Sequence, residues 1–419
     1  MAVSEESITY RLEVENELRL TVGNQAGKVK IQLITGLAEL YGTEMEVSKI
    51  YNLPALASIA LFTWQGCTIK VTGKPEYCYV VAETQMILKI ILHASIEERR
   101  MRAENENRKG PVTFIVGPTD TGKNNLCRFL LNYAAYRGRR PVFIDLDVDE
   151  NSISIPDSIG VITVTKPADI VTGFKNQDVQ LFPYGHDSPG HNIIPYILLI
   201  KKFGETLQSE LSQMNQITRY SGAIINSSGC MRGWGYRLIH FAAMTFKVDI
   251  VCVLEDAWLY QRLLKEMPRF VQVLFMPKME NAVERSRDKI MYSRITQLRE
   301  YFYGPFNELQ PFTFDVKYSE IQVLKVIPKL SAATDSFSEA TFDHTSLAPV
   351  PLDHNLINRV LALSSADTVD NDLILSHAIG FIFVKGVKIT ENVITILSLQ
   401  PGPLPKKILL MGDSKFLLH

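Results

Sequence analysis

The chain has 419 residues, enough for two or three domains, and 46% of them are hydrophobic, so it can form sizeable cores. Its formal net charge of -1 excludes a general attraction to polyanions, so any RNA site must be local. The five cysteines include no C-x-x-C pair, which favours a reducing compartment and argues against structural zinc. The first ten residues lack the apolar core of a secretory signal, and no apolar run approaches the ~20 residues of a membrane span. We therefore expect a soluble, intracellular protein without membrane association.

The N-terminal part has the pattern of an all-β domain. Residues 8–82 form short runs in which apolar and polar side chains alternate, as in half-buried strands. Residues 83–107 follow a helical pattern that passes into the charged stretch 97–100, which we interpret as the solvated end of a linker helix. We place this β domain with its linker helix at residues 1–101.

Strands and helices alternate in the middle of the chain. The candidate strands are 112–116, 141–147, 222–226 and 249–254. Helices between them predict right-handed crossovers and a parallel sheet. The predicted fold class is α/β, with a central P-loop NTPase domain at residues 102–312.

The C-terminal third begins with a break in the pattern. Residues 331–352 are rich in Ser, Thr, Ala and Pro and predict a long loop or linker. Strand patterns return at 380–384 and 393–397. A small C-terminal α/β domain is therefore expected at residues 313–419.

The most informative motif is a phosphate-binding loop. Gly117 to Lys123 match G-x-x-x-x-G-K, between the strand 112–116 and a helix predicted over 123–136. Backbone N–H groups of such a loop and the helix N-terminus bind phosphate, and Lys123 reaches the β- and γ-phosphates. The alternative, a glycine-rich turn, does not require this strand–loop–helix context. Asn124 stands where the motif has Ser or Thr, whose hydroxyl binds Mg²⁺; its carbonyl oxygen is the candidate metal ligand, on a longer arm.

Longer phrases outside the loop carry a resemblance to a known family. They are Phe62–Cys67, Leu130–Ala134, Arg139–Pro141, Ser154–Pro156, Val283–Ser286 and Glu300–Gly304. With the loop they resemble the eukaryotic RNA 5′-hydroxyl kinase family that includes the ATP-binding subunit of pre-mRNA cleavage factor II. The resemblance runs from about Glu13 to about Phe416. It implies the three-domain fold described above, ATP as ligand, a nuclear location and a role in mRNA 3′-end formation. The implied partners are the scaffold subunit of cleavage factor II, RNA and, for active members, the tRNA splicing endonuclease complex.

The resemblance also implies roles for individual residues. The nucleotide-binding set is Glu17, Ser58, Gly117, Asp120, Thr121, Gly122, Lys123, Asn124 and Asn125. Glu17 and Ser58 fall on positions that hold the adenine side, where Ser58 replaces a lysine of the family; from the pattern alone, a surface acid of a hairpin is the favoured interpretation of Glu17. The catalytic set is Lys123, Arg294 in the lid, and Asp147 as the base that accepts the 5′-hydroxyl proton. Asp147 could instead cap the loop that follows its strand.

Several positions depart from the family's pattern. Asn124 and Asn125 replace a pair of hydroxyl residues, and Cys230 replaces a tryptophan that would stack on an RNA base. Ile290 and Met291 occupy positions where the family has arginine in its lid. Two hypotheses follow: an ATP-binding subunit with lost or weak kinase activity, or an active ATP-dependent RNA 5′-hydroxyl kinase. An unrelated P-loop ATPase or GTPase is disfavoured by the phrases outside the loop.

Overall fold

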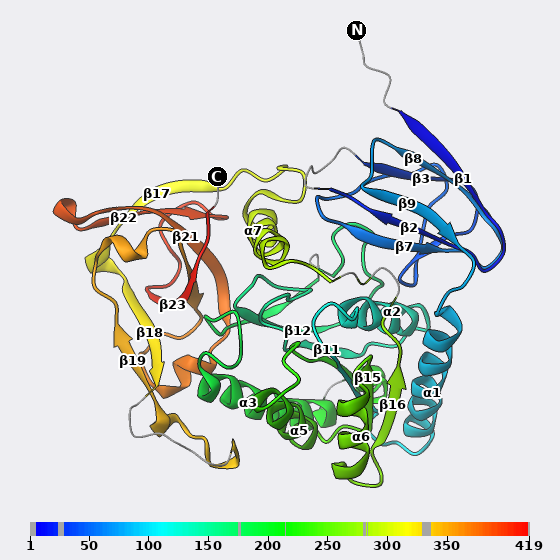
Figure 1. Cartoon of the computed structure of the whole chain (residues 1–419). Coiled ribbons are helices and arrows are strands. Elements are labelled where there is room, and N and C mark those ends of the chain that lie inside the picture. The colour runs from blue at the N-terminus through cyan, green and yellow to red at the C-terminus, as the bar shows by residue number, and fades with distance from the viewer. Residues whose placement is uncertain are drawn as a thin grey trace.

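A computed structural model describes residues 6–23, 29–174, 177–213, 215–279, 282, 284–328 and 337–417. Figure 1 shows an N-terminal β part, a central part in which helices cover a sheet, and a C-terminal part rich in strands. Helix α7 lies between the N-terminal and C-terminal parts (Figure 1). The fold class predicted from the sequence is confirmed, with the corrections given below.

The N-terminal part is a sandwich of two antiparallel sheets, in the orders β1-β8-β3-β6 and β5-β4-β7-β2-β9. The strands are β1 (Ser7–Leu12), β2 (Glu17–Thr21), β3 (Lys30–Gly36), β4 (Glu39–Leu40), β5 (Thr43–Glu44), β6 (Ile50–Asn52), β7 (Ser58–Phe62), β8 (Cys67–Thr72) and β9 (Tyr77–Val81). Along β8, buried and partly exposed side chains alternate, so one face packs in the sandwich core.

Helix α1 (Met86–Asn105) connects the sandwich to the central part, but its charged stretch is not a solvated end. Glu97 is 5% exposed and Arg100 is 1% exposed. Arg100 pairs with Glu97 at 3.3 Å and donates to the Ser221 carbonyl oxygen, while Arg139 pairs with the other Glu97 oxygen. The prediction was wrong because these partners are distant in the sequence and cannot be recognised in a local charge pattern.

The central sheet has the order β16-β15-β10-β14-β11-β12-β13. Its elements, with the helices between them, are β10 (Val112–Val116), α2 (Lys123–Tyr136), β11 (Val142–Asp145), β12 (Ser158–Thr163), β13 (Gln180–Pro183), α3 (Ile193–Gln213), α4 (Gln216–Ser221), β14 (Ala223–Asn226), α5 (Trp234–Phe246), β15 (Ile250–Leu254), α6 (Ala257–Glu266), β16 (Gln272–Met276) and α7 (Arg287–Tyr303). The pairs from β16 to β11 are parallel, but β12 is antiparallel to both β11 and β13. The sheet is therefore mixed, and not parallel throughout as the sequence predicted.

Both faces of this sheet are covered by helices. Val112, Phe114 and Val116 pack in one core with side chains of α3 and α5. Ile115 points to the opposite face and packs with side chains of α1 and α2. Because successive strand residues face opposite sides, a strand buried on both sides has a continuous apolar sequence, as β10 has. The strand that precedes the phosphate loop is thus fixed at the centre of the molecule.

In the C-terminal part, the described residues form strands and short 3₁₀ helices. They are β17 (Phe312–Lys317), η1 (Tyr318–Glu320), β18 (Gln322–Pro328), η2 (Phe337–Glu339), η3 (Phe342–His344), β19 (Thr345–Pro349), η4 (His354–Leu356), β20 (Arg359–Ser364), η5 (Asn371–Leu375), β21 (Ala378–Lys388), η6 (Ile389–Glu391), β22 (Val393–Ser398) and β23 (Ile408–Lys415). Within the predicted linker 331–352, residues 331–336 lie outside the described residues. The rest includes β19, which pairs with β18, so that segment is not an unstructured linker. Strand β21 pairs with β13 through Leu181 and Ala378, which joins this part to the central sheet.

Candidate nucleotide-binding site

The phosphate loop lies between β10 and α2, as the sequence predicted. Gly122 is the N-cap of α2 with φ 85, in the left-handed region that favours glycine. A Cβ at this position would lie 2.4 Å from the Met279 Cβ, so the segment after β16 passes directly over the loop. The buried Thr121 hydroxyl donates to the Pro118 carbonyl oxygen at 2.8 Å and so holds the loop turn.

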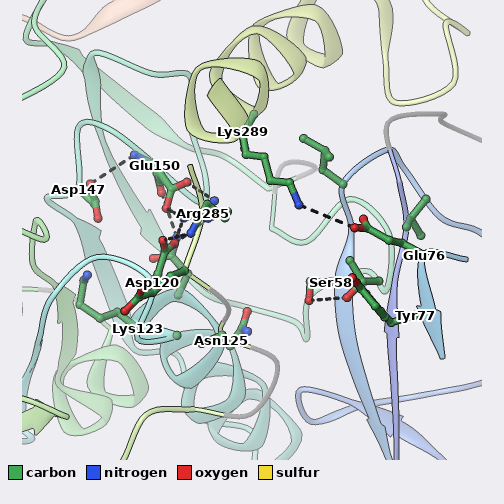
Figure 2. Close-up of a pocket in the computed structure, with 18 residues that line it drawn as sticks. Ser58, Glu76, Tyr77, Asp120, Lys123, Asn125, Asp147, Glu150, Arg285 and Lys289 are labelled. Carbon is green, nitrogen blue, oxygen red and sulfur yellow. Dashed lines mark hydrogen bonds and ion pairs between the residues drawn. The ribbon is translucent and has the colours of Figure 1, made fainter. Parts of the chain in front are cut away.

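A cavity of about 280 Å³ opens beside this loop (Figure 2). Its lining includes Asp120, Gly122, Lys123, Asn124 and Asn125 from the predicted nucleotide-binding set. Lys123 is 5% exposed and donates to the Pro118 carbonyl oxygen at 3.0 Å. The loop N–H groups, the start of α2 and this ammonium group together suit a phosphate chain.

The N-terminal sandwich forms the opposite wall of the cavity. Thr21, Ser58, Glu76 and Tyr77 line it, and the hydroxyls of Thr21 and Ser58 lie 3.3 Å apart. Ser58 therefore borders the cavity on the side opposite the phosphate loop. Glu17 does not line the cavity: it is 1% exposed at the other end of β2, where its carboxylate accepts a hydrogen bond from Arg19 at 2.9 Å.

Arg285 closes the cavity on the lid side. Its backbone N–H donates to Asp120 at 2.8 Å, and its Nε donates to the same carboxylate at 2.6 Å. Its guanidinium also donates to Glu150 at 2.5 Å (Figure 2). Neither Arg285 nor Glu150 belongs to the binding set predicted from the sequence, although Arg285 lies in the Val283–Ser286 phrase. Lys289 of α7 adds an ion pair to Glu76 of the sandwich, at 3.9 Å.

Asp147 lines the same cavity and lies just after β11. Its Oδ1 accepts the N–H groups of Asp149 at 3.2 Å and Glu150 at 3.3 Å, so it also caps the loop. Burial, against the opposing effect of Lys123, raises the Asp147 pKa to about 7. A carboxylate with this pKa exchanges protons near neutral pH, which suits a general base.

Arg294, the predicted lid residue, lies outside the cavity. Its guanidinium donates to Asp149 and to Asp157, each at 2.6 Å, and to the Ser414 hydroxyl at 3.3 Å. Arg294 is 8% exposed, so these bonds fix it between α7, the loop after β11 and the C-terminal strand. Arg294 therefore holds these segments together, whereas Arg285 is the arginine of this stretch that lines the cavity.

Two residues at or near the position where the resemblance implies an RNA-stacking tryptophan are described by the structure. Cys230 is exposed, and Trp234, four residues further along the chain, stacks on Phe337 with ring centroids 5.4 Å apart. Arg237 lies over the Trp234 ring at 4.6 Å. Trp234 is thus engaged in packing between α5 and the C-terminal part.

Asn124, the candidate magnesium ligand, is held in a hydrogen-bonded chain beneath the loop. Its Nδ2 donates to the Glu150 carbonyl oxygen at 3.0 Å, and its Oδ1 accepts from Asn226 Nδ2 at 2.7 Å. Asn226 Nδ2 also donates to Asp145 Oδ1 at 2.8 Å. The amide oxygen is therefore directed at a buried partner, and the residues here do not fit a Mg²⁺ site of the usual P-loop type.

The β-sandwich, the helix-covered sheet and the phosphate loop beside a cavity define a P-loop nucleotide-binding protein in three parts. Among the described residues, no helix combines the length and apolar character that crossing a membrane requires.

The chain belongs to the Clp1 family. Family models match it as the N-terminal beta-sandwich domain of polyadenylation factor over residues 11–103, as the mRNA cleavage and polyadenylation factor CLP1 P-loop over 117–304, and as pre-mRNA cleavage complex II protein Clp1 over 309–417.

Curated relatives cover almost the whole chain. A protein CLP1 homolog of Culex quinquefasciatus is 41% identical over 97% of both chains. A polyribonucleotide 5′-hydroxyl-kinase Clp1 of Gallus gallus is 38% identical over 97% of this chain and 96% of its own. A solved Clp1p–Pcf11p complex has the same fold, with a TM-score of 0.84 and 21% identity over 99% of both chains.

Proposed function

We propose that this chain is an ATP-binding subunit of the nuclear machinery that cleaves and polyadenylates pre-mRNA, with lost or weak kinase activity. One observation carries the proposal: the phosphate loop and Lys123 line an open cavity, while the Asn124 amide is bonded away from it. The site keeps the groups that hold a triphosphate, and it lacks the hydroxyl that places a metal ion for phosphoryl transfer. ATP would then stabilise the folded chain by mass action.

Lys123→Ala tests the nucleotide assignment. Lys123 supplies the cation at the loop, so the variant should lose ATP binding in titration calorimetry and the increase in melting temperature that ATP gives the parent chain. Unchanged ATP affinity in the variant would contradict the assignment.

The alternative function, an active RNA 5′-hydroxyl kinase, is favoured by Asp147. Its carboxylate lines the cavity with a pKa raised to about 7, as a base for the 5′-hydroxyl requires. Labelling of a 5′-hydroxyl RNA oligonucleotide by the parent chain, with Lys123→Ala as the blank, distinguishes the two functions. We expect no labelling above the blank, and robust labelling would establish the alternative.

The proposed partner is a scaffold subunit of cleavage factor II. Support comes from the match to a pre-mRNA cleavage complex II family model and from a structural relative solved with Pcf11p. The tRNA splicing endonuclease complex is the partner proposed for the kinase alternative. Affinity purification from nuclei should recover 3′-end-processing proteins, and recovery of tRNA-splicing proteins alone would favour the alternative.

A further inference from the structure

Hydrogen bonds link the Glu150 carbonyl oxygen, Asn124, Asn226 and Asp145 in a row. The groups at the two ends of this row determine how the Asn124 amide is oriented. The Glu150 backbone carbonyl can only accept a hydrogen bond, so the Asn124 atom that faces it at 3.0 Å must be the NH₂ group. The Asn124 oxygen then faces Asn226, which is 0% exposed. The asparagine oxygen is one bond further from Cβ than a serine hydroxyl, and here it accepts the hydrogen bond from Asn226 at 2.7 Å.

Asp145 lies at the other end of this row of hydrogen bonds, and its carboxylate offers no free oxygen as a metal ligand in place of Asn124. It is 0% exposed, and its Oδ2 accepts the Ser152 N–H at 2.7 Å and the Ser152 hydroxyl at 2.6 Å. Its Oδ1 accepts from Asn226 at 2.8 Å and from the Asp147 N–H at 3.2 Å. Each carboxylate oxygen therefore already accepts two donors, and a metal ion would have to displace buried hydrogen bonds.

We propose that this chain holds its nucleotide without a protein oxygen bound to Mg²⁺ at the start of α2, and that residue 124 sets the metal dependence of binding. The inference rests on the proposed ATP binding. The Asn124 amide takes the place of the metal-binding hydroxyl. Through Asn226 and Asp145, its hydrogen bonds connect the start of α2 to the ends of β14 and β11.

Three chains test this inference: the parent, Asn124→Ser and Asn124→Ala. Both variants remove the amide and leave the formal charge unchanged, but only serine adds a hydroxyl. The measurement is the ATP dissociation constant by calorimetry, in excess MgCl₂ and in EDTA, and its result is the ratio of the two constants. Because the three chains carry the same charged residues, any preference for Mg²⁺·ATP that those charges cause is equal in all three. It therefore cancels when the ratios are compared between chains.

We expect the Mg²⁺ preference of Asn124→Ser to exceed that of the parent by about tenfold or more, the usual scale for a metal-site group. Asn124→Ala should keep the parental preference. A parental preference equal to that of Asn124→Ser would overturn the inference and leave ATP binding intact. Absence of binding to all three chains in both buffers would overturn the proposed function, and the inference with it. If Asn124→Ser melts without nucleotide well below the parent, Asn124→Thr replaces it in the same comparison.

Discussion

Around Lys123, the position, pKa and ion pairing of each carboxylate depend on the residues that surround it. The phosphate loop was predictable because its motif is local and lies between a strand and a helix. Glu17 was assigned to the nucleotide site by resemblance, but its side chain does not line the cavity, because it lies at the end of β2 away from Thr21. Glu150 lines the site and pairs there with Arg285, across a separation of 135 residues that no local pattern reveals.

Asp147 gives a prediction for stability against pH. Burial raises its pKa to about 7 in the folded state, so between about pH 4 and pH 7 the folded chain binds the proton more tightly than the unfolded chain. Its contribution to stability is therefore fully present below pH 4 and is lost as the pH rises. Asp147→Asn should stabilise the chain at pH 8 by at least about 1 kcal/mol and have little effect at pH 4, measured by urea unfolding.

Asp169→Asn is the control of opposite sign. Burial alone would raise the Asp169 pKa, but the N–H groups of Thr172 and Val171 lower it overall. Its removal should therefore cost stability at pH 8 and little at pH 2. An Asp147→Asn effect that did not change with pH would show that the carboxylate is not buried as described.

Glu150 gives a prediction for nucleotide affinity. Its carboxylate pairs with Arg285 beside the phosphate loop. There it competes with a bound phosphate group for the guanidinium, and its negative charge repels the phosphate. Glu150→Gln should lower the ATP dissociation constant about fivefold to tenfold, the effect of roughly 1 kcal/mol. Glu284→Gln removes the same charge from an exposed side chain that also lines the cavity, and should change the constant less. Equal effects would show that charge alone, and not the contact with Arg285, weakens binding.

At the scale of elements, α2 connects the phosphate loop to the N-terminal sandwich. Its first turn begins at Lys123, and near its other end Asn132 donates to the Tyr41 carbonyl oxygen at 2.8 Å and to the Thr43 hydroxyl at 3.0 Å. The Tyr133 hydroxyl donates to Glu39 at 3.0 Å. The β4–β5 hairpin of the sandwich is thus fixed on the helix that carries the loop. The sequence predicted both elements from their periodicity, but their contact depends on the tertiary fold.

Gly42 lies at this contact. Its φ is 82, and a Cβ would lie 2.7 Å from the Tyr133 ring. Gly42→Ala should cost about 2 kcal/mol or more of unfolding free energy, from left-handed strain and the clash. Gly138→Ala is the matched control, because Gly138 has φ 74 with nothing within 4 Å of its Cβ. Equal losses of unfolding free energy in the two variants would mean that only backbone strain destabilises Gly42→Ala and that its Cβ does not clash with the Tyr133 ring.

At the scale of the whole molecule, Arg294 joins three regions that are far apart in the sequence. It pairs with Asp149 and Asp157, while its contact with Ser414 reaches the C-terminal strand. On the same helix α7, the Tyr301 hydroxyl oxygen accepts a hydrogen bond from the Phe381 backbone N–H at 3.0 Å. The division into three parts could be predicted from composition and periodicity. The direction of β12 and the role of Arg294 could not, because both depend on which distant segments meet.

Arg294→Met tests that role. It would leave the Asp157 carboxylate, which is 10% exposed, without its cation, so we expect a loss of about 3–5 kcal/mol in unfolding free energy. Arg287→Met removes an exposed cation from the same helix and should change stability by less than about 0.5 kcal/mol. A melting temperature like that of the parent would contradict the structural role and return Arg294 to the candidates for catalysis.

The pairing of β13 with β21 makes the third part difficult to remove. The family models divide the chain between residues 304 and 309, but the central sheet continues across that division through Leu181 and Ala378. A fragment that ended at residue 312 would keep β13 and lose its neighbour, which would expose an unpaired edge able to pair with other chains. The second and third family models therefore match separate segments of the sequence, but these two segments share one sheet in the structure. We expect a gene that lost its 3′ portion to encode a chain prone to aggregation and not a smaller nucleotide-binding protein.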